Sequence, residues 1–175
     1  MKAVIDTNVL LVAGQQHKDV APGCVNNCVT RLLDLQASGS VVIDDGYRII
    51  GEYQHKLDIN RGKNMGAAFV KWLLQNQKNP HRVERVTINE TSLHHFSEFP
   101  SQELEEEFDP SDRKFVAVAN AHPNKPPIWQ ATDSKWLNWW PVLQAHGIHV
   151  EFLCPEDVVR FYREKFPDQD VPELP

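Results

Sequence analysis

The chain has 175 residues, 41% of them hydrophobic, and a formal net charge of −6 at pH 7. This length and apolar content predict one domain with one substantial core. No apolar stretch is long enough to cross a bilayer and none resembles a targeting segment, so we exclude a membrane protein and expect a cytoplasmic one. An odd count of three cysteines argues against a secreted disulfide framework, and we interpret Cys24, Cys28 and Cys154 as buried thiols.

Apolar periodicity divides the chain into alternating strands and helices. The elements predicted in chain order are strand 3–5, helix 24–37, strand 41–43, helix 44–57, helix 65–74, strand 83–88, a helix starting near 111, strand 128–131, a helix over the tryptophans at 136–140, strand 148–153 and helix 155–166. Strands separated by helices predict an α/β fold with a parallel sheet.

Two segments lack such a pattern. Residues 97–109 are acidic and hold little apolar surface, so we expect a solvated loop or a short helix there. Residues 167–175 are rich in proline and acid, which is typical of a frayed tail.

Four carboxylates lie at the ends of predicted strands or on predicted helices. Asp6 directly follows the first strand, Glu52 lies on the helix after the second strand, Asp112 stands near a helix start and Asp133 follows a later strand. Ligands of open α/β sheets bind beyond the carboxyl ends of the strands, so these acids are candidates for one site. Each acid also has an ordinary explanation as a helix cap or a solvated side chain, and the interpretation depends on their joint occurrence.

The order and context of these acids resemble the PIN-domain nucleases over roughly residues 1–160. The resemblance rests on VIDTNVL at residues 4–10, a helical Glu52, DRKFVAVA at residues 112–119, and Thr132-Asp133. It implies a three-layer sandwich with a central, mostly parallel five-stranded sheet, forming one domain over residues 1–166. It also implies a divalent-metal-dependent endoribonuclease that cleaves RNA, as the VapC-like toxins of this family do. A cognate antitoxin would be its partner, and a homodimer is compatible with it.

The same resemblance assigns the catalytic and metal-binding residues. Asp6, Glu52 and Asp112 match the three central acids, and Asp133 matches the fourth, more variable one. Asp109 is a less favoured accessory acid. Mg²⁺ or Mn²⁺ held by carboxylates supplies an activated water and stabilises the leaving oxygen of a phosphodiester.

Residues beside the acids are candidates for supporting contacts or for substrate binding. We expect hydrogen bonds from Thr7, Asn8, Thr132 and Ser134, and phosphate contacts from Arg48, Lys56, Arg113 and Lys114. Residues 48–85 contain eight Lys or Arg side chains against three acids, a charge of +5 that leaves −11 on the remainder. RNA could approach an otherwise acidic chain along this basic segment. The ordinary alternative is a solvated basic surface without a ligand. Its basic residues are Arg48, Lys56, Arg61, Lys63, Lys71, Lys78, Arg82 and Arg85.

Other functions remain open at the level of sequence. A structure-specific DNA nuclease would use the same acids, and a catalytically silent binding module would use the acidic segment 97–109 or the tryptophan helix as a contact surface. An aspartyl-phosphate phosphatase is less favoured, because Asn8 stands where a second aspartate is expected.

Overall fold

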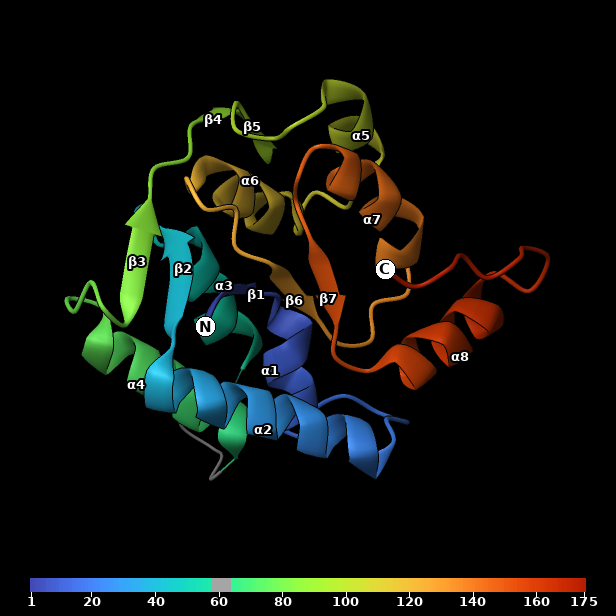
Figure 1. Cartoon of the computed structure of the whole chain (residues 1–175), viewed down its shortest axis with the longest axis horizontal. Helices are drawn as coiled ribbons and strands as arrows, with labels where there is room; N and C mark the ends of the chain where they lie inside the picture. The colour runs from blue at the N-terminus through green and yellow to red at the C-terminus, as the bar shows by residue number, and fades with distance from the viewer. Residues whose placement is uncertain (58–63) are drawn as a thin grey trace.

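A five-stranded, all-parallel sheet lies at the centre of the protein in a computed structural model that describes residues 1–57 and 64–175 (Figure 1). Its strand order is β3-β2-β1-β6-β7. The strands are β1 (Lys2–Ile5), β2 (Ser40–Asp44), β3 (Val83–Val86), β6 (Ile128–Gln130) and β7 (Val150–Phe152). Every neighbouring pair is parallel, which confirms the sheet predicted from the pattern.

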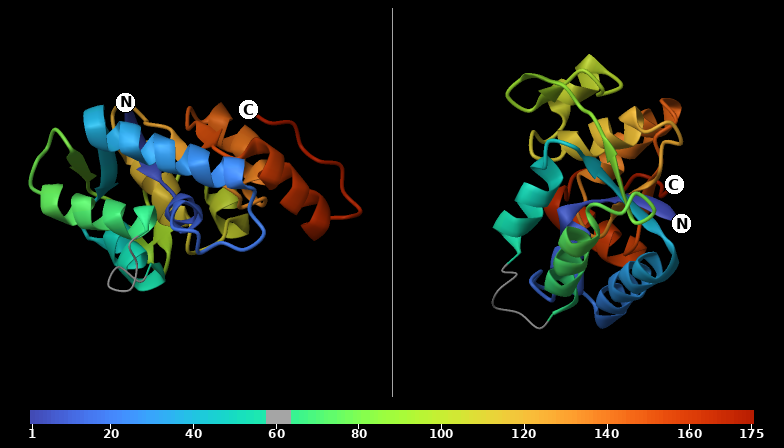
Figure 2. Two further views of the ribbon diagram at one scale, coloured as in Figure 1. Left: turned by 90° about the horizontal axis from the view of Figure 1, so that it is seen from below. Right: turned by 90° about the vertical axis from the view of Figure 1, so that its left-hand side faces the viewer.

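Helices cover both faces of this sheet, as a parallel sheet requires. They are α1 (Thr7–Ala13), α2 (Pro22–Ser38), α3 (Arg48–Lys56), α4 (Met65–Asn76), α5 (Gln102–Glu107), α6 (Arg113–Ala121), α7 (Trp136–Ala145) and α8 (Pro155–Lys165). Helices α1, α2 and α4 contact one another on one side, whereas α6 contacts β1, β2 and β6 from the other (Figures 1 and 2). The result is the expected three-layer α/β sandwich.

The path of the chain creates a switch point between β1 and β6. From β1 the chain moves outward through β2 to β3, then returns to the other side of β1 to form β6 and β7. Crossovers that leave in opposite directions open a crevice at the carboxyl ends of the two middle strands. Asp6 follows β1 and Asp133 lies three residues after β6, so both acids are at this crevice.

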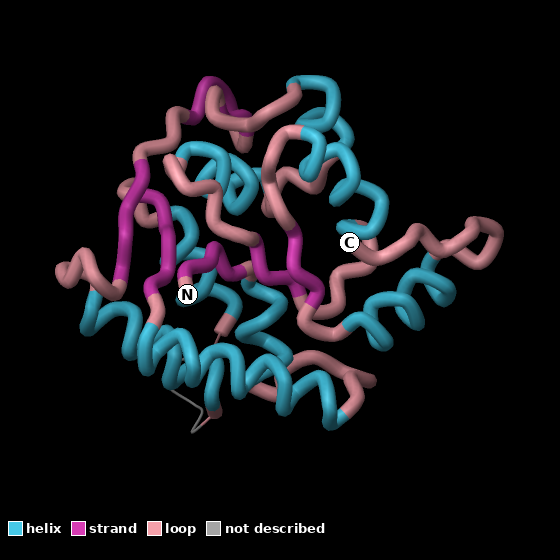
Figure 3. Tube along the Cα trace, viewed as in Figure 1, coloured by secondary structure: helices cyan, strands magenta, loops and turns pink. Residues whose placement is uncertain are grey.

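The segment between β3 and α6 differs from its expected form. Residues 90–96 form an antiparallel hairpin of β4 (Glu90–Ser92) and β5 (His95–Phe96), which lies apart from the main sheet (Figure 3). Phe99, Leu104 and Phe108 are buried in the acidic stretch that follows, so the expectation of little apolar surface is wrong. Their irregular spacing has neither the helical nor the strand period, and the acidic residues of α5 dominate the composition.

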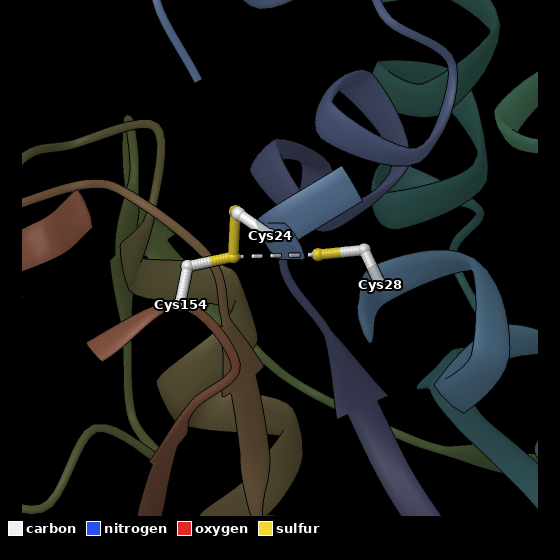
Figure 4. Close-up of side chains that lie close together, drawn as sticks. All are labelled: Cys24, Cys28 and Cys154. Carbon is white, nitrogen blue, oxygen red and sulfur yellow. Dashed lines mark hydrogen bonds between the residues drawn. A yellow bond between two sulfur atoms is a disulfide. The ribbon is translucent and has the colours of Figure 1, made fainter. Parts of the chain in front are cut away.

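The cysteines also differ from the expectation of three thiols. Cys24 on α2 and Cys154 after β7 form a disulfide that joins positions 130 residues apart, while Cys28 is free and buried (Figure 4). The Cys28 sulfur lies 3.8 Å from that of Cys154. Burial raises the pKa of the Cys28 thiol to about 12. Only the pairing of elements distant in sequence brings Cys154 to α2, which is why spacing along the chain did not reveal it.

The C-terminal tail makes contacts that its composition did not predict. The indole nitrogen of Trp140 donates to the carbonyl oxygen of Glu173 over 3.0 Å, and the hydroxyl of Tyr162 donates to Gln169 over 3.0 Å. Val171 packs against a small apolar cluster around Leu137 and Tyr162. These contacts hold the tail against α7 and α8.

Candidate metal centre

All four predicted acids lie at the carboxyl edge of the sheet. Asp6 and Asp133 follow β1 and β6, and Glu52 lies on α3, which follows β2. Asp112 immediately precedes α6, and because α6 leads into the parallel strand β6, its N-terminus is also at this edge. The local structure orients two of the carboxylates: an Asp6 oxygen accepts from the Asn8 amide over 2.8 Å, and an Asp133 oxygen accepts from the Lys135 amide over 3.1 Å.

The electrostatics of Asp6 show that the acids are close to one another. Asp6 is buried, and its burial together with the negative charge of Asp112 raises the pKa of its carboxyl well above the usual value. Asp133 and Glu52 raise it further, and the hydrogen bond from Asn8 opposes the rise. The other three acids therefore all act on Asp6.

The pKa values of Asp112 and Asp133 are raised as well. Burial, followed by the charge of Asp133, raises the pKa of Asp112 to about 7, although Ser111 and the Trp136 indole donate hydrogen bonds to its carboxylate. Burial also raises the pKa of Asp133. Carboxylate oxygens of Asp109, Asp112 and Asp133 lie within 4.8 Å of one another. Among the residues that the structure describes, no lysine or arginine forms an ion pair with Asp6, Asp112 or Asp133.

This donor set fits a hard divalent cation. All the converging ligand atoms are carboxylate oxygens, which Mg²⁺ and Mn²⁺ prefer. A cation would also remove the repulsion that raises the pKa values of Asp6 and Asp112. Asp109 is the exception in this group, because the Lys135 ammonium already pairs with its carboxylate over 2.5 Å. Asp109 nevertheless belongs to the group of three carboxylates whose oxygens lie within 4.8 Å of one another, and Asp6 and Glu52 do not belong to that group.

Glu52 is held differently from the three aspartates. The Lys114 ammonium donates to one Glu52 oxygen and to the Ser111 carbonyl, and the Thr7 hydroxyl donates to the other Glu52 oxygen. Lys114 is buried, so this ion pair is shielded from water. Glu52 is thus paired with a cation and positioned by the protein itself.

Asn8 and Thr132 join the two middle strands at the crevice. The Asn8 side-chain oxygen accepts from the Thr132 amide over 2.7 Å and from the Thr132 hydroxyl over 2.9 Å. These bonds connect the start of α1 to the turn that carries Asp133. Thr7, Asn8 and Thr132 therefore make the supporting hydrogen bonds expected of them, and Ser134 is buried in the wall of an adjoining cavity.

Two of the four predicted phosphate contacts have other partners. Arg48 lies between Asp44 and Glu90, at 3.5 and 3.2 Å. Arg113 is buried and donates to the carbonyl oxygens of Phe108 and His94 over 3.1 and 3.3 Å. Both guanidinium groups tie the β4–β5 segment to the domain, so the structure does not support a phosphate role for them. Arg113 adjoins Asp112 in sequence, but consecutive side chains near a helix start point in different directions. Arg48 is four residues from Glu52, and its guanidinium instead pairs with Asp44 and Glu90.

The remaining basic candidates divide into three cases. Lys114 binds Glu52, as described above, and Lys56 is exposed in the last turn of α3. Arg61 and Lys63, together with Asp58 of the same segment, lie outside the described residues. Lys135 and Trp136 contact the acids but were not predicted as site residues: Lys135 donates to Asp109 and Trp136 donates to Asp112. The one sequence feature that could have indicated them is their position directly after Ser134.

Comparisons with known proteins identify no relative. No protein-family model matches the chain, and neither a curated protein nor a solved structure matches it significantly. Among the described residues, no helix is both long and apolar enough to span a membrane.

Proposed function

We propose that this protein is a PIN-like, divalent-metal-dependent endoribonuclease. The observation that carries the proposal is the convergence of Asp6, Glu52, Asp112 and Asp133 at the switch point of the sheet, where burial and mutual repulsion raise the pKa of Asp6. Buried, perturbed carboxylates in a crevice are typical of functional sites, and this set calls for a cation.

The acids and the residues that hydrogen-bond to them have different roles in the proposed phosphodiester hydrolysis. Asp6, Asp112 and Asp133 would hold Mg²⁺ or Mn²⁺. When bound, the metal supplies an activated water and stabilises the leaving oxygen. Glu52, fixed by Thr7 and Lys114, orients a water beside the aspartates. Asn8 and Thr132 keep the two strand ends in register, so that Asp6 and Asp133 stay at one site.

Cleavage of defined RNAs with Mg²⁺, Mn²⁺ or EDTA tests this proposal. We expect cleavage that EDTA abolishes and that Asp6→Asn or Asp112→Asn lowers at least about 100-fold, because even loss of an outer-sphere partner costs about 10–100-fold. Asp34→Asn is the matched control, since Asp34 is exposed on α2 away from the acids, and it should retain full activity. Cleavage that survives EDTA and both site variants would refute the proposal.

Side-by-side assays with different substrates distinguish this proposal from its alternatives. Equal amounts of single-stranded RNA, structured RNA and branched DNA decide between an endoribonuclease and a structure-specific DNA nuclease. A folded protein that binds neither metal nor nucleic acid would instead favour a catalytically silent binding module. A toxin role, an antitoxin partner and a homodimer extend the proposal by resemblance. A cytoplasmic location was expected because nothing in the sequence resembles a targeting segment, and the Cys24–Cys154 disulfide argues against it.

A further inference from the structure

A cavity of about 500 Å³ opens directly beside the candidate metal centre. Its lining comes from the turn that carries the centre, with Thr132, Asp133 and Ser134, and from the α1–α2 connection and α8, with His17, Phe161, Glu164 and Lys165. This volume is in the range of about 300–1,000 Å³ that small-molecule and cofactor sites occupy. The cavity can therefore receive a group attached to whatever reacts at the acids.

The lining from the α1–α2 connection and α8 combines aromatic surface with one cation, Lys165, and one acid, Glu164, whose carboxylate pairs with Arg160 over 3.4 Å. The rings of His17 and Phe161 lie 5.6 Å apart at 50°, and both side chains are partly exposed. Lys165 is four residues beyond Phe161 on α8 and so lies on the same face of this helix. Its ammonium acts electrostatically on Asp133, which also lines the cavity.

His17 is fixed in this lining by a contact at each ring nitrogen. Its Nδ1 lies 2.9 Å from the Lys18 carbonyl oxygen, and its Nε2 lies 3.4 Å from the Thr132 hydroxyl oxygen.

We propose that this cavity binds the nucleotide next to the scissile phosphodiester of a single-stranded RNA. The Arg160 guanidinium lies over one face of Phe161, 4.3 Å from the ring centroid. The base stacks on the remaining exposed surface of the Phe161 and His17 rings, and Lys165 pairs with the backbone phosphate. Base stacking on aromatic rings beside a cation is how proteins hold single strands, whose bases are free to turn outward. This inference rests on the proposed nuclease function and adds to it the strandedness of the substrate and the residues that grip it.

RNA binding by a catalytically silenced protein tests the cavity directly. In the Asp112→Asn background, the Kd for a short fluorescent single-stranded RNA is measured with Mg²⁺ present. Lys165→Glu should raise Kd about tenfold, and Phe161→Ala should raise it about 5- to 100-fold, the range measured for loss of one stacked base. Phe161→Tyr, which keeps the ring, should restore binding.

Arg163→Glu is the matched control for charge. Arg163 is exposed on the same helix and makes the same change of sign, but it does not line the cavity. Its Kd should stay within about threefold of the parent, because an exposed charge outside the contact acts only through the screened field. An equal effect of Lys165→Glu and Arg163→Glu would overturn the proposal, as would unchanged binding by Phe161→Ala.

Cross-linking and cleavage separate failure of the cavity from failure of the function. RNA carrying a photoreactive base should cross-link to Phe161 or to residues beside His17, and cross-links found only elsewhere would overturn the proposal even if a variant misfolds. With the native acids, Lys165→Glu should raise KM much more than it lowers kcat. Metal-dependent cleavage by Lys165→Glu with an unchanged KM would refute the proposed RNA subsite but not the nuclease function. No cleavage by the native protein with any metal would refute the nuclease function itself.

Discussion

The carboxyl group of Asp112 is half-buried beside Asp133, and desolvation together with the charge of Asp133 raises its pKa to about 7. A carboxyl in the unfolded chain releases its proton near pH 4. Between these two values the folded protein binds more protons than the unfolded one, so its free energy of unfolding falls as the pH rises. Ionised Asp112 therefore destabilises the metal-free fold at neutral and higher pH.

Replacing this carboxyl with an amide should stabilise the metal-free protein in a pH-dependent way. A tenfold difference in proton affinity corresponds to about 1.4 kcal/mol, and 1 kcal/mol shifts Tm by about 2–4 °C in a chain of this size. We expect Asp112→Asn to raise Tm by about 5–10 °C at pH 8 in EDTA and to leave it nearly unchanged at pH 4. Thermal melts at both pH values measure this difference.

A distant carboxyl provides the control for that experiment. Asp34→Asn removes one exposed negative charge from α2 and should leave Tm nearly unchanged at either pH. Excess Mg²⁺ should raise the Tm of the native protein more than that of Asp112→Asn, because ligand binding stabilises the folded state. A gain for Asp112→Asn of the same size at pH 4 and pH 8 would show that repulsion is not its cause.

At the scale of elements, the close approach of α4 to α1 positions the start of the site. A Cβ atom added to Gly66 on α4 would lie 2.3 Å from the Leu10 carbonyl oxygen on α1 and 2.8 Å from a Leu57 methyl carbon. Helix α1 begins immediately after Asp6. The absence of a side chain at Gly66 thus allows the helix contact that holds Asp6 at the crevice.

Gly66→Ala should therefore destabilise the protein and weaken the site together. Because backbone must move to admit the methyl group, we expect a loss of about 1–3 kcal/mol in urea unfolding. Metal affinity, followed by titration calorimetry, should fall as α1 shifts. Gly51→Ala is the control on α3, where an added Cβ meets nothing within 4 Å, and it should stabilise by about 0.4–1 kcal/mol. Equal effects of the two changes would contradict this explanation.

At the scale of the whole molecule, the Cys24–Cys154 disulfide connects α2 with the start of α8. Neighbouring contacts support the same junction: the Asn27 amide donates to the Leu153 carbonyl, and Arg160 on α8 binds the Asp19 carbonyl. Helix α8 carries Phe161 and Lys165 of the cavity wall. The disulfide therefore attaches α8, which lines the proposed RNA subsite, to α2 near the N-terminus of the chain.

Loss of this disulfide should lower the stability of the whole domain. A crosslink closing a long loop restricts the unfolded chain, and its removal by Cys24→Ser should cost about 2–4 kcal/mol in urea unfolding under oxidising conditions. The native protein should lose a similar amount when a thiol reductant is added. A Cys24→Ser/Cys28→Ser variant should not respond to the reductant, because it also removes the Cys28 thiol that lies 3.8 Å from the Cys154 sulfur. Native protein that is equally stable with and without reductant would show that the crosslink contributes nothing.

Local patterns were sufficient to predict the main sheet and most of its helices, although α1 (Thr7–Ala13) was not among the predicted elements. Strands rich in β-branched residues and helices with an apolar stripe have periods that can be read from neighbouring residues alone. The rule that parallel strands expose ligand sites at their carboxyl ends, together with the resemblance, predicted one site for Asp6, Glu52, Asp112 and Asp133.

The tertiary structure decided what each of these side chains contacts. Arg113 and Lys114 are adjacent in sequence, yet one binds backbone carbonyls beside the hairpin and the other binds Glu52. Neither the disulfide nor the cavity of His17, Phe161 and Lys165 has a local signal, since each joins segments more than a hundred residues apart. Sequence determines local periodicity and charge, whereas partners across the fold depend on the packing of distant elements, which no short pattern encodes.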